Sequence, residues 1–242
     1  MFVTTPAAPG VTVLRRLLGR LLDARGGVAM IEFAYALPLL VTVGMAGTEA
    51  ANLALVTLRV NQLAMLAADN AARVRISMDE TDVNEVMIGM RFAGSGIAFG
   101  ERGRVIISDI ESNGITAPNS NAGYKITWQR CFGAKDVASV YGAAGTGATT
   151  AALKFGVRTT GPATTTTGPD AGTVPVTNGA LIVAEVRYTY KPLLASMFMG
   201  NRELRAVQTF PVRDRAGQTL TNSSNLPDTA KRLCDSAHLR AT

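Results

Sequence analysis

Histidine and cysteine are scarce in this chain. Its 242 residues include one histidine, His238, and two cysteines, Cys131 and Cys234. A structural or catalytic metal site needs several ligands at suitable spacing, and a nucleophilic catalyst needs a base beside the nucleophile. One histidine close to the carboxyl end supplies neither arrangement, and the acidic residues show no paired spacing. The sequence therefore predicts no enzyme activity, no metal site and no cofactor. His238 is interpreted as a solvated side chain, and a pair with Cys234 is the alternative.

Features that would indicate nucleic acid or nucleotide binding are also lacking. The formal net charge is +6, but the first 27 residues hold half of this excess, as four arginines against Asp23. The remaining chain has no Lys/Arg cluster interleaved with aromatic residues. Residues 142–147, GAAGTG, lack the Gly-Lys-Ser/Thr ending of a phosphate loop. The sequence therefore predicts neither a nucleic-acid partner nor a small-molecule substrate.

Long apolar runs are absent, with one exception near the amino terminus. Residues 28–47 read VAMIEFAYALPLLVTVGMAG, and Glu32 is the only charge among them. About 20 apolar residues suffice for a helix to cross a bilayer, and an excess of arginine beside such a helix keeps that side cytoplasmic. The sequence therefore predicts three segments: a basic cytoplasmic leader (1–27), a single transmembrane helix (28–48) and a head on the other side of the membrane (49–242).

The position of the glycines differs from that in a secretory signal peptide. Such a peptide has small residues after its apolar core, whereas Gly26 and Gly27 precede the run here. The following residues form a recognisable set: Gly27, Glu32, Phe33, Pro38-Leu39-Leu40 and Glu49. This set resembles the amino-terminal region of TadE-like minor pilins, which are pseudopilins of the tight-adherence (Flp) type IV pili. Residues 181–192, LIVAEVRYTYKP, resemble a later strand of the same family.

The resemblance implies a processing site and a set of partners. A prepilin peptidase would cut between Gly27 and Val28, so that Glu32 becomes the fifth residue of a mature chain of 215 residues. Glu32 and Phe33 would act in assembly with other major and minor pilins. The protein would reside in the bacterial inner membrane with its head in the periplasm, or enter an extracellular pilus that serves adhesion. The soluble region is longer than in the short members of the family.

Other interpretations of these residues stay open. Glu32 near the end of a spanning helix can extend its carboxylate to the membrane surface, and the Gly26-Gly27 pair can be a helix boundary. The chain would then be an uncleaved, membrane-anchored periplasmic binding or scaffold protein. A periplasmic enzyme tethered by one helix is a further alternative.

The head is predicted to have an α+β fold of pilin type. Apolar residues at three- and four-residue steps predict one long helix over 32–76, although two glycines within 44–48 leave two helices as an alternative. A second helix is expected to begin at Thr81 or Asp82, followed by a loop over 91–103. Alternating patterns predict four strands that form an antiparallel sheet on the long helix. These strands are residues 104–112, 124–129, 180–191 and 204–213. In the second strand, Tyr124, Ile126 and Trp128 are expected to share the face against the helix.

Two segments of biased composition complete the head. Residues 141–179 are rich in Gly, Thr and Pro, which predicts a mobile surface insertion that buries little. This insertion is either a contact region at a pilus tip or a solvated excursion without a partner. The polar tail, residues 216–242, is expected to be flexible. A disulfide between Cys131 and Cys234, favoured by an oxidising periplasm, would attach it to the sheet.

Overall fold

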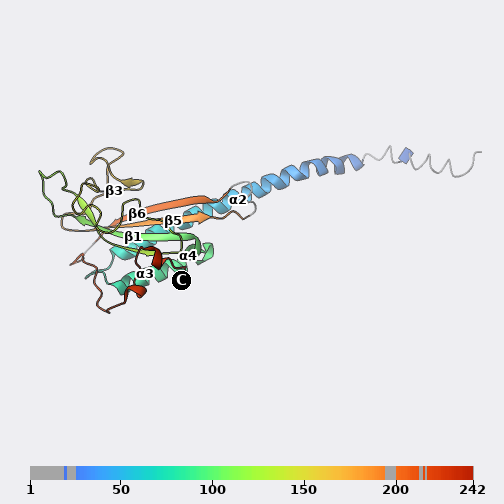
Figure 1. Cartoon of the computed structure of the whole chain (residues 1–242). Coiled ribbons are helices and arrows are strands. Elements are labelled where there is room, and N and C mark those ends of the chain that lie inside the picture. The colour runs from blue at the N-terminus through green and yellow to red at the C-terminus, as the bar shows by residue number, and fades with distance from the viewer. Residues whose placement is uncertain (1–18, 21–25, 194–199, 213–214, 216, 242) are drawn as a thin grey trace, which may run out of the picture. The chain divides into compact units, whose positions relative to one another are not determined.

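The computed structural model describes residues 19–20, 26–193, 200–212, 215 and 217–241 (Figure 1). Most of the basic leader therefore lies outside the described residues. The chain divides into two compact units, Met1–Ala51 and Asn52–Thr242. One helix, α2 (Gly26–Ala72), contributes its first part to one unit and its second part to the other. It continues through residues 44–48, so the alternative of two helices is wrong.

The first unit is the apolar part of α2. This helix is long and apolar enough to cross a membrane, and it is the only such helix among the described residues. The two threonine hydroxyls in this apolar part are satisfied within the helix: Thr42 donates to the carbonyl of Pro38 at 2.7 Å, and Thr48 donates to that of Gly44 at 2.9 Å. Such internal hydrogen bonds are what a helix in lipid requires, since lipid offers no partners.

In the second unit, α2 presents a buried face of small and branched residues. Val60, Leu63, Ala64, Ala67 and Ala71 are each at most 1% exposed. They recur at steps of one, three or four residues, which places them on one side of the helix, as the sequence pattern predicts. Because alanine has only a methyl group, this face lets the helix backbone approach the strands beneath it closely.

Four antiparallel strands form the sheet under this helix. They are β1 (Gly103–Ser112), β2 (Tyr124–Phe132), β5 (Leu181–Tyr190) and β6 (Arg202–Pro211), in the order β2-β1-β5-β6. All three neighbouring pairs are antiparallel. The predicted α+β fold, a long amino-terminal helix packed on an antiparallel sheet, is therefore confirmed.

Both faces of the sheet are covered. On β5, Ile182, Ala184 and Val186 belong to the core under α2, whereas Leu181 and Val183 belong to a second cluster on the opposite face. The alternation predicted for this strand is thus confirmed. The strand lies inside the sheet with a layer on each side, so Leu181 and Val183 on the second face are buried as well, whereas Glu185, Arg187 and Thr189 make the rest of that face polar.

The prediction for β2 is wrong in one respect. Ile126 and Trp128 were expected on the same face, but Ile126 packs in the second cluster and Trp128 in the core under α2. The register with β1 shifts here, since Trp128 lies opposite Asp109 and Ile126 lies opposite Ile110. One additional residue in a strand reverses the direction of the side chains that follow it.

The second helix starts earlier than predicted. Helix α3 is Glu80–Ala93, and its N-cap is Asp79, whose carboxylate accepts from the amide of Thr81 while Asp82 accepts from the amide of Asp79. The predicted loop that follows contains the short helices η1 (Ser95–Ile97) and α4 (Phe99–Arg102). Phe99 is fully buried and stacks 6.4 Å from the ring of Tyr188, so it anchors this segment to the core.

The insertion buries more than its composition predicts. Tyr141, Leu153 and Val157 are at most 2% exposed and pack on the face of the sheet opposite α2. The segment also contains a two-stranded sheet of β3 (Val157–Arg158) and β4 (Gly161–Pro162). The expectation of little burial is therefore wrong, because a few apolar side chains among many Gly and Thr residues suffice to cover the sheet.

Candidate functional site

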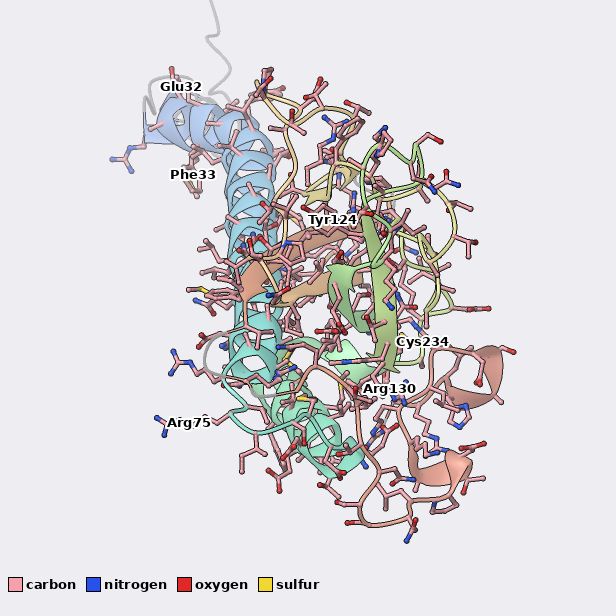
Figure 2. All side chains as sticks on the ribbon, turned by 90° about the vertical axis from the view of Figure 1, so that its left-hand side faces the viewer. Glu32, Phe33, Arg75, Tyr124, Arg130 and Cys234 are labelled. Atoms are coloured by element: carbon pink, nitrogen blue, oxygen red, sulfur yellow. A yellow bond between two sulfur atoms is a disulfide. The ribbon has the colours of Figure 1, made fainter. Side chains whose placement is uncertain are left out.

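The predicted processing residues lie at the start of α2. Gly27 is exposed, and no atom would contact a Cβ placed on it. Val28 is 55% exposed, and Glu32 follows it by four residues, which in a helix places both on one side, one turn apart. Figure 2 shows Glu32 and Phe33 on this first part of the helix, and Phe33 is 61% exposed. The backbone of residues 27 and 28 is therefore accessible within the first unit.

Large apolar side chains surround this motif on α2. The exposed ones from Val28 to Met45 are Val28, Met30, Ile31, Phe33, Tyr35, Leu37, Leu39, Leu40, Val41, Val43 and Met45. An apolar surface of this extent is not stable in water and marks contact with lipid or with other apolar helices. Glu32 is the only charged residue within 28–48, and a carboxylate at that depth is costly unless it pairs with a positive charge.

A second feature, in the head, is the pairing of the two cysteines. Cys131 lies on β2 and Cys234 lies in the tail. Their sulfur atoms are 2.12 Å apart and their Cα atoms 4.9 Å apart, so they form the predicted disulfide. Since Cys234 is engaged in this bond, the alternative of a Cys234–His238 pair is wrong. The ring of His238 instead contacts the carboxylate of Asp235 and the carbonyl of Asp228.

A buried arginine reinforces the connection between tail and sheet. The guanidinium of Arg104, on β1, donates to the carbonyl of Cys234 at 3.0 Å and to those of Gly133 and Lys135 at 3.4 Å. Arg104 is 1% exposed, and burial lowers its pKa, although the charges of Asp136 and Asp235 oppose that shift. No sequence pattern indicates this role, because Arg104 is more than 100 positions from the tail.

Asp79 fixes the other end of the tail. One carboxylate oxygen accepts from the amide and hydroxyl of Thr81, and the other accepts from the hydroxyl of Thr221 and from the amide and hydroxyl of Ser223. These bonds hold the pKa of Asp79 well below its usual range. The spacing of Asp79 and Asp82 matches a capping box, so this cap could have been found in the sequence.

We expect the replacement Asp79→Ala to destabilise the head by about 1–2 kcal/mol, the loss typical of a helix cap. Because the folded pKa of Asp79 is depressed, its contribution is complete above the unfolded pKa of about 3.9 and is lost as the pH falls toward the folded pKa. Urea unfolding at neutral pH and at low pH measures both effects. A difference between parent and variant that stays the same at low pH would contradict this account.

One buried carboxyl group has a strongly perturbed pKa. Asp109, on β1, is 0% exposed, and neither of its oxygens has a hydrogen-bond partner among the described residues. Burial and the neighbouring Glu111 carboxyl raise the pKa of Asp109 to about 8, against the opposing charge of Arg215. Asp109 is therefore neutral at pH 7. Since solvent does not reach it, we interpret it as a core residue.

Both cysteines of the disulfide line a cavity of the head. It has a volume of about 440 Å³, and its lining combines apolar residues with the polar side chains of Gln129, Arg130, Ser139 and Asp235. The amide of Gln129 donates to the hydroxyl of Ser108 and to the carbonyl of Gly142, which occupies its donors. The lining provides no histidine beside Ser139 to act as its base. Among the described residues, no group of three His, Cys, Asp or Glu side chains could hold a metal ion.

Comparisons with known proteins add no relative. No family model matches the chain, and neither a curated protein nor a solved structure matches it.

Proposed function

We propose that this chain is a minor pilin or pseudopilin of the TadE-like type, which takes part in the assembly of a tight-adherence pilus and hence in surface adhesion. The observation that carries the proposal is Gly27 directly before the exposed apolar segment 28–48 of α2, in which Glu32 is the fifth residue and the only charge. The α+β head, with a helix on an antiparallel sheet, is compatible with this family.

In the proposed mechanism, cleavage and assembly use neighbouring residues. A prepilin peptidase cuts between Gly27 and Val28 on the cytoplasmic side of the inner membrane and leaves an ammonium group on Val28. The apolar helix then joins the helices of other pilins, while the head stays in the periplasm. Glu32 lies about 6 Å along the helix axis from Val28 and pairs with the ammonium of a neighbouring subunit. Because an unpaired carboxylate in an apolar bundle is costly, this pair fixes the axial register.

Mass determination of the membrane-extracted protein tests the proposal directly. Cells that contain the prepilin peptidase should yield a chain that begins at Val28, and cells without it should yield the full chain. An intact Met1 in peptidase-positive cells would instead favour an uncleaved, membrane-anchored scaffold protein.

The replacement Glu32→Val should separate assembly from processing. We expect membrane insertion, cleavage and the disulfide to remain, because Glu32 is exposed on α2. Recovery with other pilins should fall at least about tenfold, since one lost charge pair in an apolar bundle exceeds 1.4 kcal/mol. The measurement is co-purification from detergent extracts, with Met30→Val in the same helix as the matched control. Incorporation equal to that of the parent would show that Glu32 merely extends to the membrane surface.

A further inference from the structure

Among the described residues, the four-stranded sheet of the head has one open edge. In the order β2-β1-β5-β6, strand β6 bonds to β5 and to no other described strand. The amide of Val212 donates to the carbonyl of Ala180 at 2.9 Å, and Phe210 lies opposite Ile182 in the same register. Because hydrogen-bonded positions alternate along an antiparallel strand, the even-numbered residues bond to β5. The outward amides therefore belong to Glu203, Arg205, Val207 and Thr209.

The opposite edge of the sheet is covered. The amide of Cys131, on β2, donates to the carbonyl of Arg232 in the tail at 2.7 Å. The amide of Ile126 donates to the carbonyl of Thr146 in the insertion at 2.9 Å. The disulfide holds the tail in this position. Open edges usually attract a further strand, and here only β6 is left unprotected in the described part of the four-stranded sheet.

A groove lined by both apolar and charged side chains runs beside this open edge. It has a volume of about 610 Å³, and its lining includes Met65 and Asp69 of α2 and Phe210 and Pro211 of β6. Met65 is 56% exposed, and Leu58, two turns earlier on the helix, is 59% exposed. Figure 1 shows β6 alongside the second part of α2. The groove therefore offers apolar side chains next to the unpaired main-chain groups of β6.

The two elements run in the same direction. Asn52, at the start of this part of α2, donates to the hydroxyl of Tyr190 at 2.8 Å, and Tyr190 lies opposite Arg202 at the start of β6. Phe210, near the end of β6, lines the groove with Met65. An antiparallel β6–β6 pair between two copies would therefore reverse the direction of α2 in the second copy.

Exposed positive charges lie at both ends of the edge. Arg202 begins β6, and Arg75, labelled in Figure 2, lines the groove near its end. Both side chains are exposed, and neither has an ion-pair partner among the described residues. The nearby carboxylates are already neutralised, since Asp69 pairs with Arg73 and Glu203 pairs with Arg187. The net charge along the edge is thus positive.

We infer that the β6 edge and the groove along Met65 form a docking surface for an extended, acidic and apolar segment of a different polypeptide. Unpaired main-chain groups select a strand, the groove selects apolar side chains, and Arg75 and Arg202 select carboxylates. A second copy fits poorly, because it would oppose the same arginines and reverse α2, and its own β2 edge is covered. This inference concerns the head and goes beyond the proposed cleavage and helix assembly.

Hydrogen exchange of the full-length protein in phosphatidylcholine nanodiscs tests the docking surface. The probe is a peptide of about eight residues, the length that spans β6, in which valine alternates with glutamate. The control peptide has lysine in place of glutamate. We expect the acidic peptide to slow exchange of the amides of Glu203, Arg205, Val207 and Thr209 at least about tenfold, and the basic peptide to leave them nearly unchanged.

Two variants and a matched control localise the effect. Thr209→Pro removes an outward amide but no bond to β5, as Pro211 already does, and Met65→Glu places a carboxylate in the groove. Each should weaken binding of the acidic peptide about tenfold. Phe92→Glu changes a residue of α3 that is 66% exposed, outside the groove, and should bind like the parent. Met65→Glu alters an exposed residue, so it remains informative if Thr209→Pro fails to fold.

Several results would overturn the inference. If neither peptide slows exchange of the β6 amides, no strand docks at this edge. If both peptides slow exchange equally, the arginines do not select an acidic segment. Protection that increases with protein concentration without peptide would identify a second copy as the occupant. Protection without peptide in nanodiscs that contain phosphatidylglycerol would identify the membrane. None of these results bears on whether the mature chain begins at Val28, so failure here is distinguishable from failure of the proposed function.

Discussion

The replacement Gly27→Leu is expected to abolish cleavage and leave the full chain of 242 residues in the membrane. The proposed prepilin peptidase would have to bring its catalytic carboxylates close to the backbone between Gly27 and Val28, and a branched side chain at this position would obstruct that approach. In the protein itself, no atom lies within 4 Å of a Cβ at Gly27. We therefore expect the helix to tolerate the substitution and the effect to be on processing.

Gly44→Leu is the matched control for this experiment. Gly44 lies in the same apolar helix and also has no atom within 4 Å of an added Cβ, but it is 17 residues beyond Gly27. The control should be cleaved like the parent, as shown by the mass of the extracted chain. A Gly27→Leu protein that begins at Val28 would exclude the proposed cleavage mechanism, whatever the fate of the control.

Much of the fold follows from periodicity in the sequence. The steps of Val60, Leu63, Ala67 and Ala71 predict a helix with one buried side, and the alternation of residues 181–190 predicts a strand. Both are observed, because one apolar stripe on a helix or strand must be buried against another element. The apolar helix at the amino end is equally evident, since among the described residues only one helix is long and apolar enough to span a bilayer.

The two wrong predictions, for β2 and for the insertion, concern features that periodicity in the sequence does not record. A single additional residue in β2 places Ile126 and Trp128 on opposite faces, and no propensity predicts where a strand acquires such a bulge. The insertion appeared able to bury little because its average composition conceals Tyr141, Leu153 and Val157. Composition describes a segment as a whole, whereas coverage of a sheet depends on a few side chains at fixed positions.

The same limit applies to the candidate sites. Gly27, Glu32 and Phe33 are close in sequence, so a short pattern identifies them. The contact between Arg104 and the carbonyl of Cys234 joins residues 130 positions apart and leaves no local pattern. The open β6 edge is likewise a property of strand order, which is known only once the sheet is assembled. Long-range contacts of this kind require the folded chain.

The second large effect is expected from removal of the disulfide. The bond closes a loop of 103 positions between Cys131 and Cys234, and the chain-entropy model assigns such a closure about 4–5 kcal/mol. The double variant Cys131→Ala/Cys234→Ala should lose most of this free energy of unfolding. Urea unfolding can be followed by the fluorescence of Trp128, the only tryptophan, which is 5% exposed in the core under α2.

Loss of the bond should release the tail before it disturbs the sheet. The tail contains Lys231 and Arg232, which trypsin can cleave once the segment leaves β2, whereas Trp128 reports only on the core. In native buffer we expect faster tryptic cleavage of the double variant with unchanged Trp128 fluorescence. Reductant should produce the same change in the parent and none in the variant, which already lacks the bond. Free thiols at both positions of the exported parent, or equal tryptic cleavage of the two proteins, would show that the tail is held by Arg104 and Asp79 without the disulfide.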